Sequence, residues 1–128
     1  ASRVGYVDKA YNLFLHATRL DLDDYNNELE QGLHITSMAG GWLAIVRGFA
    51  GMQVLEGLMS FSPTIPQKWN SYTFKINFRE RTLQLCINKR NIEVKLIKGQ
   101  SLKIKVYEKE YILEENNPAI ISTSIKNQ

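Results

Sequence analysis

The stretch Gly32-Leu33-His34-Ile35-Thr36-Ser37-Met38-Ala39-Gly40-Gly41 organises this chain, because it leads from a polar turn into an apolar helix. The apolar run continues as Trp42-Leu43-Ala44-Ile45-Val46 and then through Phe49, Met52, Val54 and Leu55. A segment that is apolar on nearly every side predicts a helix that is buried over most of its surface.

The start of this helix is a candidate anion site. Thr36 or Ser37 can serve as the N-cap, and the first turn carries no acidic residue. An uncharged helix N-terminus beside His34 can hold an oxyanion, and Gly40 and Gly41 add no bulk that would block its approach. In the alternative interpretation the hydroxyl only caps the helix, the glycines only allow close packing, and His34 is a hydrogen-bonded core residue. Spacing alone does not choose between the two, because one cap and one histidine are a weak motif.

Length and composition are those of a globular protein. The 128 residues can hold one domain or two small ones. A single cysteine, Cys86, excludes an internal disulfide and fits the cytoplasm. The longest apolar run is broken by glycines and contains Arg47, which argues against a membrane span, and no signal peptide is visible. The start at Ala1, without methionine, is compatible with processing and suits a fragment of a longer protein.

The first half predicts two helices and a stiff crossover. Apolar residues recur at helical spacing from about Val4 to Leu20, which predicts an amphipathic helix. The segment from Asp21 to Gln31 is a polar connection, and its acidic residues do not have the spacing of a calcium-binding loop. In a pair of helices, one helix cannot bury a partner that is apolar on all sides, so we expect further helices of a larger assembly to cover the rest. Pro63 and Pro66 favour an extended crossover. Trp69 is expected to pack at the junction.

From Ser71 onward the period changes to two. Apolar and polar residues alternate in four segments and in a shorter fifth segment that begins at Tyr111, which predicts half-buried strands. The short turns between these segments predict an antiparallel meander. From Lys75 to Lys109 there are ten basic and three acidic residues, so the solvent-exposed face of the predicted strands is basic. Nucleic-acid binding would need exposed aromatic residues among these cations, but the aromatic residues lie on the apolar face. Solvated lysines that discourage edge pairing are the alternative.

Several kinds of chemistry are missing from the sequence. It has no P-loop, no dinucleotide fingerprint and no cysteine–histidine metal cluster. The second histidine, His16, is explained by a favourable position near a helix C-terminus. Four carboxylates could supply acids for glycoside chemistry, but nothing visibly buries one of them: Asp23, Asp24, Glu28 and Glu30.

A resemblance adds to this interpretation. Residues 18–26, Glu30, residues 32–42, Gly48-Phe49, residues 58–63 and Trp69 closely resemble the C-terminal part of glycoside hydrolase family 65, in particular its maltose phosphorylases. Phosphorylases of kojibiose, nigerose and trehalose are also similar. The resemblance covers nearly the whole chain, with a specific loop-and-helix motif and a generic strand half.

The resemblance implies an α+β fold, with the last helices of an (α/α)6 barrel followed by a small antiparallel β domain that is sandwich-like. The corresponding boundaries are barrel helices over 1–57, a linker over 58–66, the β domain over 67–117 and a tail over 118–128. It also implies that inorganic phosphate attacks an α-glucosyl disaccharide with inversion, giving β-glucose 1-phosphate and glucose. Phosphate is then a co-substrate, with no cofactor and no metal.

Within this resemblance His34 helps to hold phosphate, with Thr36 and Ser37 in the same neighbourhood. The general-acid glutamate lies upstream and has no counterpart here, so the fragment alone is expected to be inactive. The partners are phosphate, the disaccharide and the missing barrel helices, with no nucleic acid and no membrane. A homodimer is one option for the parent, whose oligomeric state the sequence leaves open.

Two other functions stay open. One is a non-catalytic carbohydrate-binding or scaffolding β module, although a platform rich in tryptophan is not evident. The other is a trehalase-like hydrolase of the same family, against which the intact phosphate motif argues. The sequence does not identify the disaccharide, because the sugar-contacting loops are not in this chain.

Overall fold

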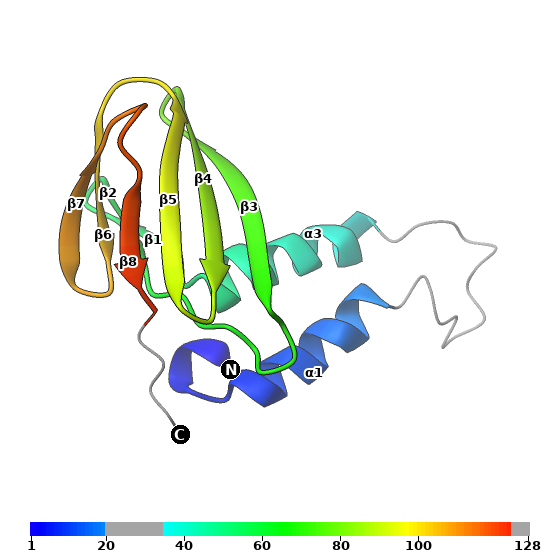
Figure 1. Cartoon of the computed structure of the whole chain (residues 1–128). Helices are drawn as coiled ribbons and strands as arrows, with labels where there is room; N and C mark the ends of the chain where they lie inside the picture. The colour runs from blue at the N-terminus through cyan, green and yellow to red at the C-terminus, as the bar shows by residue number, and fades with distance from the viewer. Residues whose placement is uncertain (20–34, 124–128) are drawn as a thin grey trace.

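The computed structural model describes residues 1–19 and 35–123. Two helices stand side by side next to a sandwich of two β-sheets (Figure 1). The helical elements are η1 (Ser2–Val4), α1 (Val7–Thr18), α3 (Ile35–Leu43) and the π-helix η3 (Ala44–Phe49). The strands are β1 (Gln53–Leu55), β2 (Leu58–Phe61), β3 (Ser71–Phe78), β4 (Arg81–Asn88), β5 (Asn91–Lys98), β6 (Leu102–Val106), β7 (Lys109–Leu113) and β8 (Ala119–Ser122). The α+β class expected from the sequence is confirmed.

The first predicted helix is present as η1 and α1. Gly5 separates them with a φ of +88°, in the left-handed region that glycine tolerates best. Tyr11, Phe14 and Leu15 form the half-buried side of α1, as their spacing predicts. No residue of α1 is fully buried.

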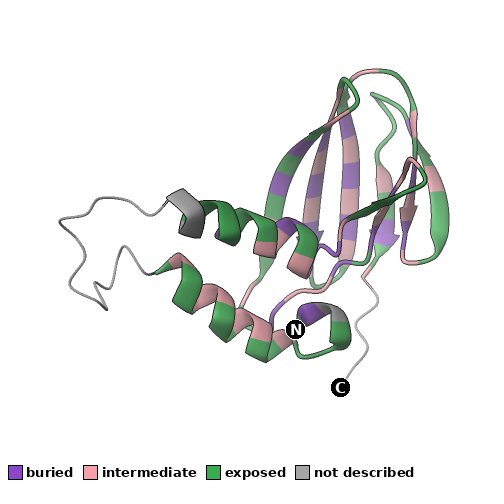
Figure 2. Cartoon of the chain, turned by 180° about the vertical axis from the view of Figure 1, so that it is seen from behind, coloured by how far each residue is buried: buried purple, intermediate pink, exposed green. Residues whose placement is uncertain are grey.

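The second helix differs from the prediction in burial and in length. Met38 and Trp42 are 53% and 48% exposed, so α3 shows apolar side chains to solvent (Figure 2). The first buried apolar side chain is that of Val46 in η3. The helix ends before Gly51, whose φ is +62° and whose added Cβ would lie 2.8 Å from the carbonyl oxygen of Ser62. Val54 is therefore in strand β1 rather than in the helix.

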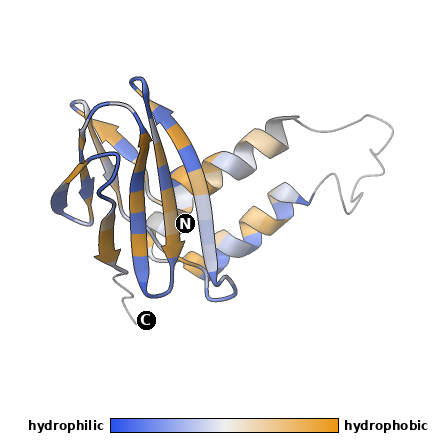
Figure 3. Ribbon diagram, turned by 45° about the horizontal axis from the view of Figure 1, so that its top comes forward, coloured by the Kyte–Doolittle hydropathy of each residue, from blue (hydrophilic) through white to orange (hydrophobic). Residues whose placement is uncertain are grey.

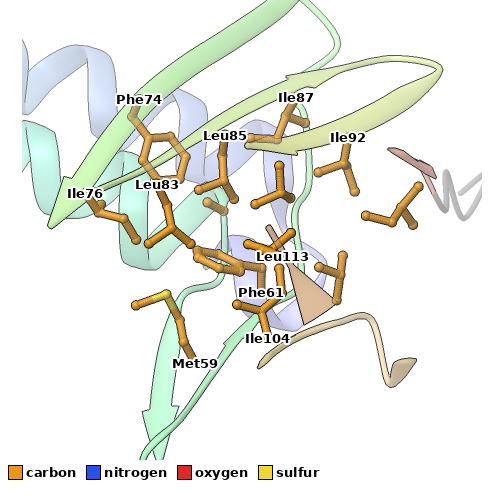
Figure 4. Close-up of a cluster of buried hydrophobic side chains, with 14 of the residues drawn as sticks. Met59, Phe61, Phe74, Ile76, Leu83, Leu85, Ile87, Ile92, Ile104 and Leu113 are labelled. Carbon is orange, nitrogen blue, oxygen red and sulfur yellow. The ribbon is translucent and has the colours of Figure 1, made fainter. Parts of the chain in front are cut away.

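The β half is a sandwich of two four-stranded sheets. One sheet has the order β1-β2-β6-β7 and the other the order β3-β4-β5-β8. Apolar and polar residues alternate along the strands (Figure 3), so each sheet turns one apolar face inward. Ten of the buried side chains are labelled between the sheets in Figure 4: Met59, Phe61, Phe74, Ile76, Leu83, Leu85, Ile87, Ile92, Ile104 and Leu113.

The predicted meander is correct from β3 to β5 and again from β6 to β7, but it is wrong at the step from β5 to β6. The segment 99–101 carries the chain into the opposite sheet, where β6 pairs in parallel with β2, Met59 opposite Ile104. Three extended residues span about 10 Å, which is also the distance between packed sheets. A short link therefore does not oblige consecutive strands to pair with each other.

Three predicted segments contain strands instead. The linker expected over 58–66 begins as β2, with Met59 and Phe61 buried, so the irregular crossover runs over 62–70. The tail expected over 118–128 contains β8, which pairs with β5 and buries Ile121. The helical segment expected up to residue 57 ends earlier, because β1 lies within it. Strands this short give a weak sequence signal, since alternation needs several residues to be recognised.

The positive charge on the solvent-exposed faces of the strands is partly neutralised by nearby carboxylates. Lys95 pairs with Glu93 at 3.1 Å and Lys103 with Glu110 at 3.2 Å. Phe74 is buried and Tyr72 and Phe78 are half-buried, as the alternation predicts. The aromatic side chains of β3 therefore pack toward the core between the sheets.

Candidate functional site

The start of α3 keeps part of its predicted character. Its first turn contains no acidic residue. Because Ile35 is already helical, Thr36 and Ser37 lie inside the first turn, and the N-cap prediction for either of them is wrong. Their side chains and the whole of His34 lie outside the described residues, so their roles in binding phosphate stay predictions.

The two glycines of α3 have different surroundings. An added Cβ at Gly41 would lie 2.7 Å from the Cγ2 methyl of Thr18, so here α1 and α3 approach more closely than a side chain would allow. A Cβ at Gly40 would meet nothing within 4 Å. The close-packing explanation therefore fits Gly41, whereas the surface at Gly40 is open.

Trp69 packs at the junction of helices and sandwich, as predicted. Its ring lies 5.9 Å from Tyr11, 5.5 Å from Phe14, 5.1 Å from Phe49 and 5.6 Å from Tyr72, measured between centroids. Most of these contacts are edge-to-face, a favourable geometry for aromatic pairs. This aromatic junction joins α1, η3 and the start of β3.

The crossover 62–70 is held by hydrogen bonds that the sequence analysis missed. The Tyr72 hydroxyl donates to the Thr64 carbonyl at 2.8 Å, and the Tyr107 hydroxyl donates to the Pro63 carbonyl at 2.7 Å. Burial raises the pKa of Tyr72, and the neighbouring Tyr107 raises it further. The sequence could have indicated such bonds, because the backbone carbonyls of a proline-rich segment that does not pair in a sheet still need hydrogen-bond donors.

The remaining histidine and the acidic side chains of the described residues do not gather into a metal site. His16 lies in the last turn of α1, where the sequence analysis placed it. Among residues 1–19 and 35–123, no cluster of three histidine, cysteine or acidic side chains could hold a metal ion. In the same ranges no helix combines the length and apolar character needed to cross a bilayer.

Comparison with protein families matches both halves of the chain. Residues 1–43 match the model of the "Glycosyl hydrolase family 65 central catalytic domain". Residues 52–113 match that of the "Glycosyl hydrolase family 65, C-terminal domain". The chain belongs to glycosyl hydrolase family 65. The first match holds α1 and α3, whereas the second holds strands β1 to β7.

Several relatives of the family 65 chain are disaccharide phosphorylases by name. It is 45% identical over 114 residues to the maltose phosphorylase of Bacillus subtilis (strain 168), covering 89% of this chain and 15% of that protein. It is 38% identical over 122 residues to the alpha,alpha-trehalose phosphorylase of Geobacillus stearothermophilus, covering 95% of this chain and 16% of that one. A solved structure from the human microbiome, provisionally named a kojibiose phosphorylase, superposes with a TM-score of 0.90 at 38% identity. The superposition covers 100% of this chain and 19% of the chain in that solved structure. The family 65 chain therefore spans about one sixth of the length of the curated relatives it matches.

Proposed function

We propose that this chain is the C-terminal part of a disaccharide phosphorylase that acts on maltose. Inorganic phosphate attacks the anomeric carbon of the α-glucosyl residue with inversion, and the products are β-glucose 1-phosphate and glucose. The observation that carries the proposal is the 45% identity to a maltose phosphorylase, compared with 38% to a trehalose phosphorylase. Phosphate is the only co-substrate, and the location is cytoplasmic.

The proposed phosphate ligands are His34, Thr36 and Ser37. A first turn of α3 without acidic residues supports this assignment, because an anion there experiences the positive end of the helix dipole and no carboxylate of the same turn competes with it. The general acid is supplied by another part of the longer polypeptide, so residues 1–128 alone have no activity.

The exposed apolar side chains of the helix pair support the existence of such a longer polypeptide. Leu13 is 56% exposed, and three residues of α3 are similarly open: Met38, Trp42 and Leu43. Apolar side chains exposed together on one helix pair are unfavourable in water unless another protein surface covers them. We assign this role to the remaining helices of the catalytic domain.

The test is an assay of the full-length protein that contains this chain. Maltose, trehalose, kojibiose and nigerose are each incubated with and without inorganic phosphate, and the anomer of glucose 1-phosphate is identified by NMR. Phosphate-dependent formation of the β-anomer from maltose is the expected result. Release of glucose without phosphate would instead indicate a hydrolase, and turnover of another disaccharide would refute the maltose assignment.

The proposed ligand is tested in the same protein with His34→Ala. We expect the KM for phosphate to rise about tenfold or more, because a hydrogen bond to a charged ligand contributes about 1.5–3 kcal/mol. His16→Ala replaces the same type of side chain in α1 and is expected to leave the KM for phosphate unchanged. An unaltered phosphate KM in His34→Ala would remove this residue from the proposed site.

A further inference from the structure

Strand β8 covers only half of the β5 edge that it pairs with. The register joins Ile92 to Ile121 and Val94 to Ala119, and the pairing ends there (Figure 1). Strand β5 itself continues to Lys98, so residues 95–98 extend past the start of β8. A strand from the interior of the sheet therefore has a stretch of edge without a neighbouring strand.

The alternation of the ladder places the backbone groups of Leu96 on this open edge. The Thr123 amide donates to the Arg90 carbonyl at 3.0 Å, in the register that β5 and β8 share. Hydrogen-bonded and non-hydrogen-bonded positions alternate in an antiparallel pair, so Ile92 and Val94 also exchange bonds with β8. Leu96 is the next residue whose N–H and C=O point to the same side.

The segment that runs past this edge does not supply the missing bonds. In the same register Asn117 would face Leu96, but the Asn117 amide donates to the Glu114 carbonyl at 3.1 Å instead. Pro118, which lies between Asn117 and β8, has no N–H to donate. Among the described residues, no hydrogen bond joins the Leu96 backbone to the segment 115–118. Leu96 is only 3% exposed, so a buried donor and a buried acceptor lie side by side and still need partners.

A hollow of about 250 Å³ lies at this place, and we call it the Leu96 hollow. Residues of β5 and of the facing segment line it: Lys95, Leu96, Ile97, Glu115, Asn116 and Pro118. On one side the β5–β8 pairing ends at Val94, and on the other side the Gly99 amide donates to the Glu115 carboxylate at 3.0 Å. One water takes up roughly 30 Å³ in the liquid, so the Leu96 hollow has room for several waters or for one small organic molecule.

Charge and shape favour a compact, neutral ligand for the Leu96 hollow. Lys95 pairs with Glu93 at 3.1 Å, and the Glu115 carboxylate accepts the bond from Gly99. The two charged residues of the lining are of opposite sign, and both have partners. An extended peptide would need the place along β5 that segment 115–118 takes, so the hollow suits a compact ligand better than an added strand.

We propose that the Leu96 hollow binds one ring of a neutral sugar. Neighbouring hydroxyl groups of a pyranose can accept from the Leu96 N–H and donate to the Leu96 C=O, which satisfies both buried groups at once. The Asn116 amide is a further polar group of the lining, and Ile97 and Pro118 provide aliphatic surface for the C–H groups of the ring. Binding here needs no turnover, so the proposal does not depend on the phosphorolysis proposed above.

The test is amide hydrogen exchange of the full-length protein, measured by mass spectrometry of overlapping peptides from β4 and β5. Without sugar, the Leu96 amide should exchange faster than those of Ile92 and Val94, because it has no bond to a neighbouring strand. Titration with D-glucose should slow exchange of the Leu96 amide in a saturable manner and leave β4 unchanged. The readout is local, so glucose bound elsewhere in the longer protein does not contribute to it.

Two substitutions in the lining, Asn116→Ala and Ile97→Ala, test which side chains take part. Both residues are exposed, so we expect the variants to fold. Each should raise the Kd for glucose about threefold or more, through loss of a hydrogen bond or of apolar contact. The matched control is Ile112→Ala, which removes an exposed isoleucine from β7 in the other sheet and should leave the Kd unchanged.

Several results would overturn the proposal. One is exchange of the Leu96 amide that stays the same at every glucose concentration. A second is equal slowing in β4 and β5, which is a general solvent effect of the sugar. A third is protection of Leu96 by inorganic phosphate but not by glucose, which would indicate an anion site. An unaltered Kd in both lining variants would also overturn it, and if a variant does not fold, the wild-type titration still decides.

Discussion

Tyr72 and Tyr107 donate their phenol hydroxyls to the carbonyl oxygens of two consecutive residues. Tyr72 bonds to Thr64 at 2.8 Å and Tyr107 bonds to Pro63 at 2.7 Å. Tyr72 belongs to β3 and Tyr107 to the turn between β6 and β7, so the two tyrosines come from opposite sheets. The crossover that leads from the helices to the sandwich is therefore fixed by both sheets at once.

Removal of one of these hydroxyls should destabilise the chain. Tyr107→Phe leaves the carbonyl of the buried Pro63 without its donor, and we expect a loss of about 1–3 kcal/mol in the free energy of unfolding. Urea denaturation monitored by circular dichroism measures it. Tyr6→Phe removes an exposed hydroxyl and should cost less than about 0.5 kcal/mol. Equal effects of the two substitutions would contradict this role for Tyr107.

The raised pKa of Tyr72 predicts a loss of stability at alkaline pH. Below the ordinary tyrosine value of 10.0 the hydroxyl is protonated in both the folded and the unfolded chain. Above it, the unfolded chain releases the proton while the folded chain keeps it, so the unfolded state is favoured by up to about 1.4 kcal/mol per pH unit. The contribution of Tyr72 is therefore fully present below pH 10 and is lost as the pH rises further. Unfolding free energies of wild type and Tyr72→Phe between pH 8 and 11 should converge, and parallel curves would refute the prediction.

A turn without glycine offers a stabilising substitution. Glu108 follows Tyr107 in the turn between β6 and β7 and has a φ of +119°, a region that is nearly restricted to glycine. Glu108→Gly should raise the free energy of unfolding by roughly 1 kcal/mol, because the strain exceeds the value of the exposed ion pair with Lys105. Glu108→Ala removes the same ion pair without relieving the strain. A thermal-shift comparison should place the glycine variant above wild type and the alanine variant at or below it.

The two neighbouring glycines of α3 should respond in opposite directions. Gly41→Ala places a Cβ against the Thr18 methyl, which cannot turn away easily because the Thr18 hydroxyl donates to the Phe14 carbonyl at 2.9 Å. We expect a loss of about 1–3 kcal/mol. Gly40→Ala meets open space and should stabilise the helix by up to about 1 kcal/mol. Denaturation midpoints that move together would show that the helices do not approach as closely as the structure has them.

Much of the β domain could be predicted from the sequence, because alternation directly reports which side of a strand is buried. The strands around Phe74, Leu85 and Val94 lie where the period of two places them, and Trp69 lies at the junction. The parallel pairing of β2 with β6 could not be predicted. Neither Met59 nor Ile104 carries a local sign of its partner, since strand pairing across a long loop is set by the packing of the whole sandwich.

The second helix shows where an apolar pattern alone misleads. The apolar positions Met38 and Trp42 predict burial, but nothing among residues 1–19 and 35–123 covers them. The candidate site is a harder case, because a histidine and two hydroxyls carry little information until a family resemblance gives them a role. For His34 that role remains a prediction.

The place of β6 between β2 and β7 constrains the order in which the protein can be completed. During translation, β2 leaves the ribosome long before residues 102–113 and has an unsatisfied edge until they arrive. The helices emerge earlier still, and the backbone bonds that hold η3 lie next to this unfinished sheet. A messenger RNA truncated before the codons of β6 therefore yields a product with an open strand edge, which favours association with other nascent chains over completion of the sandwich.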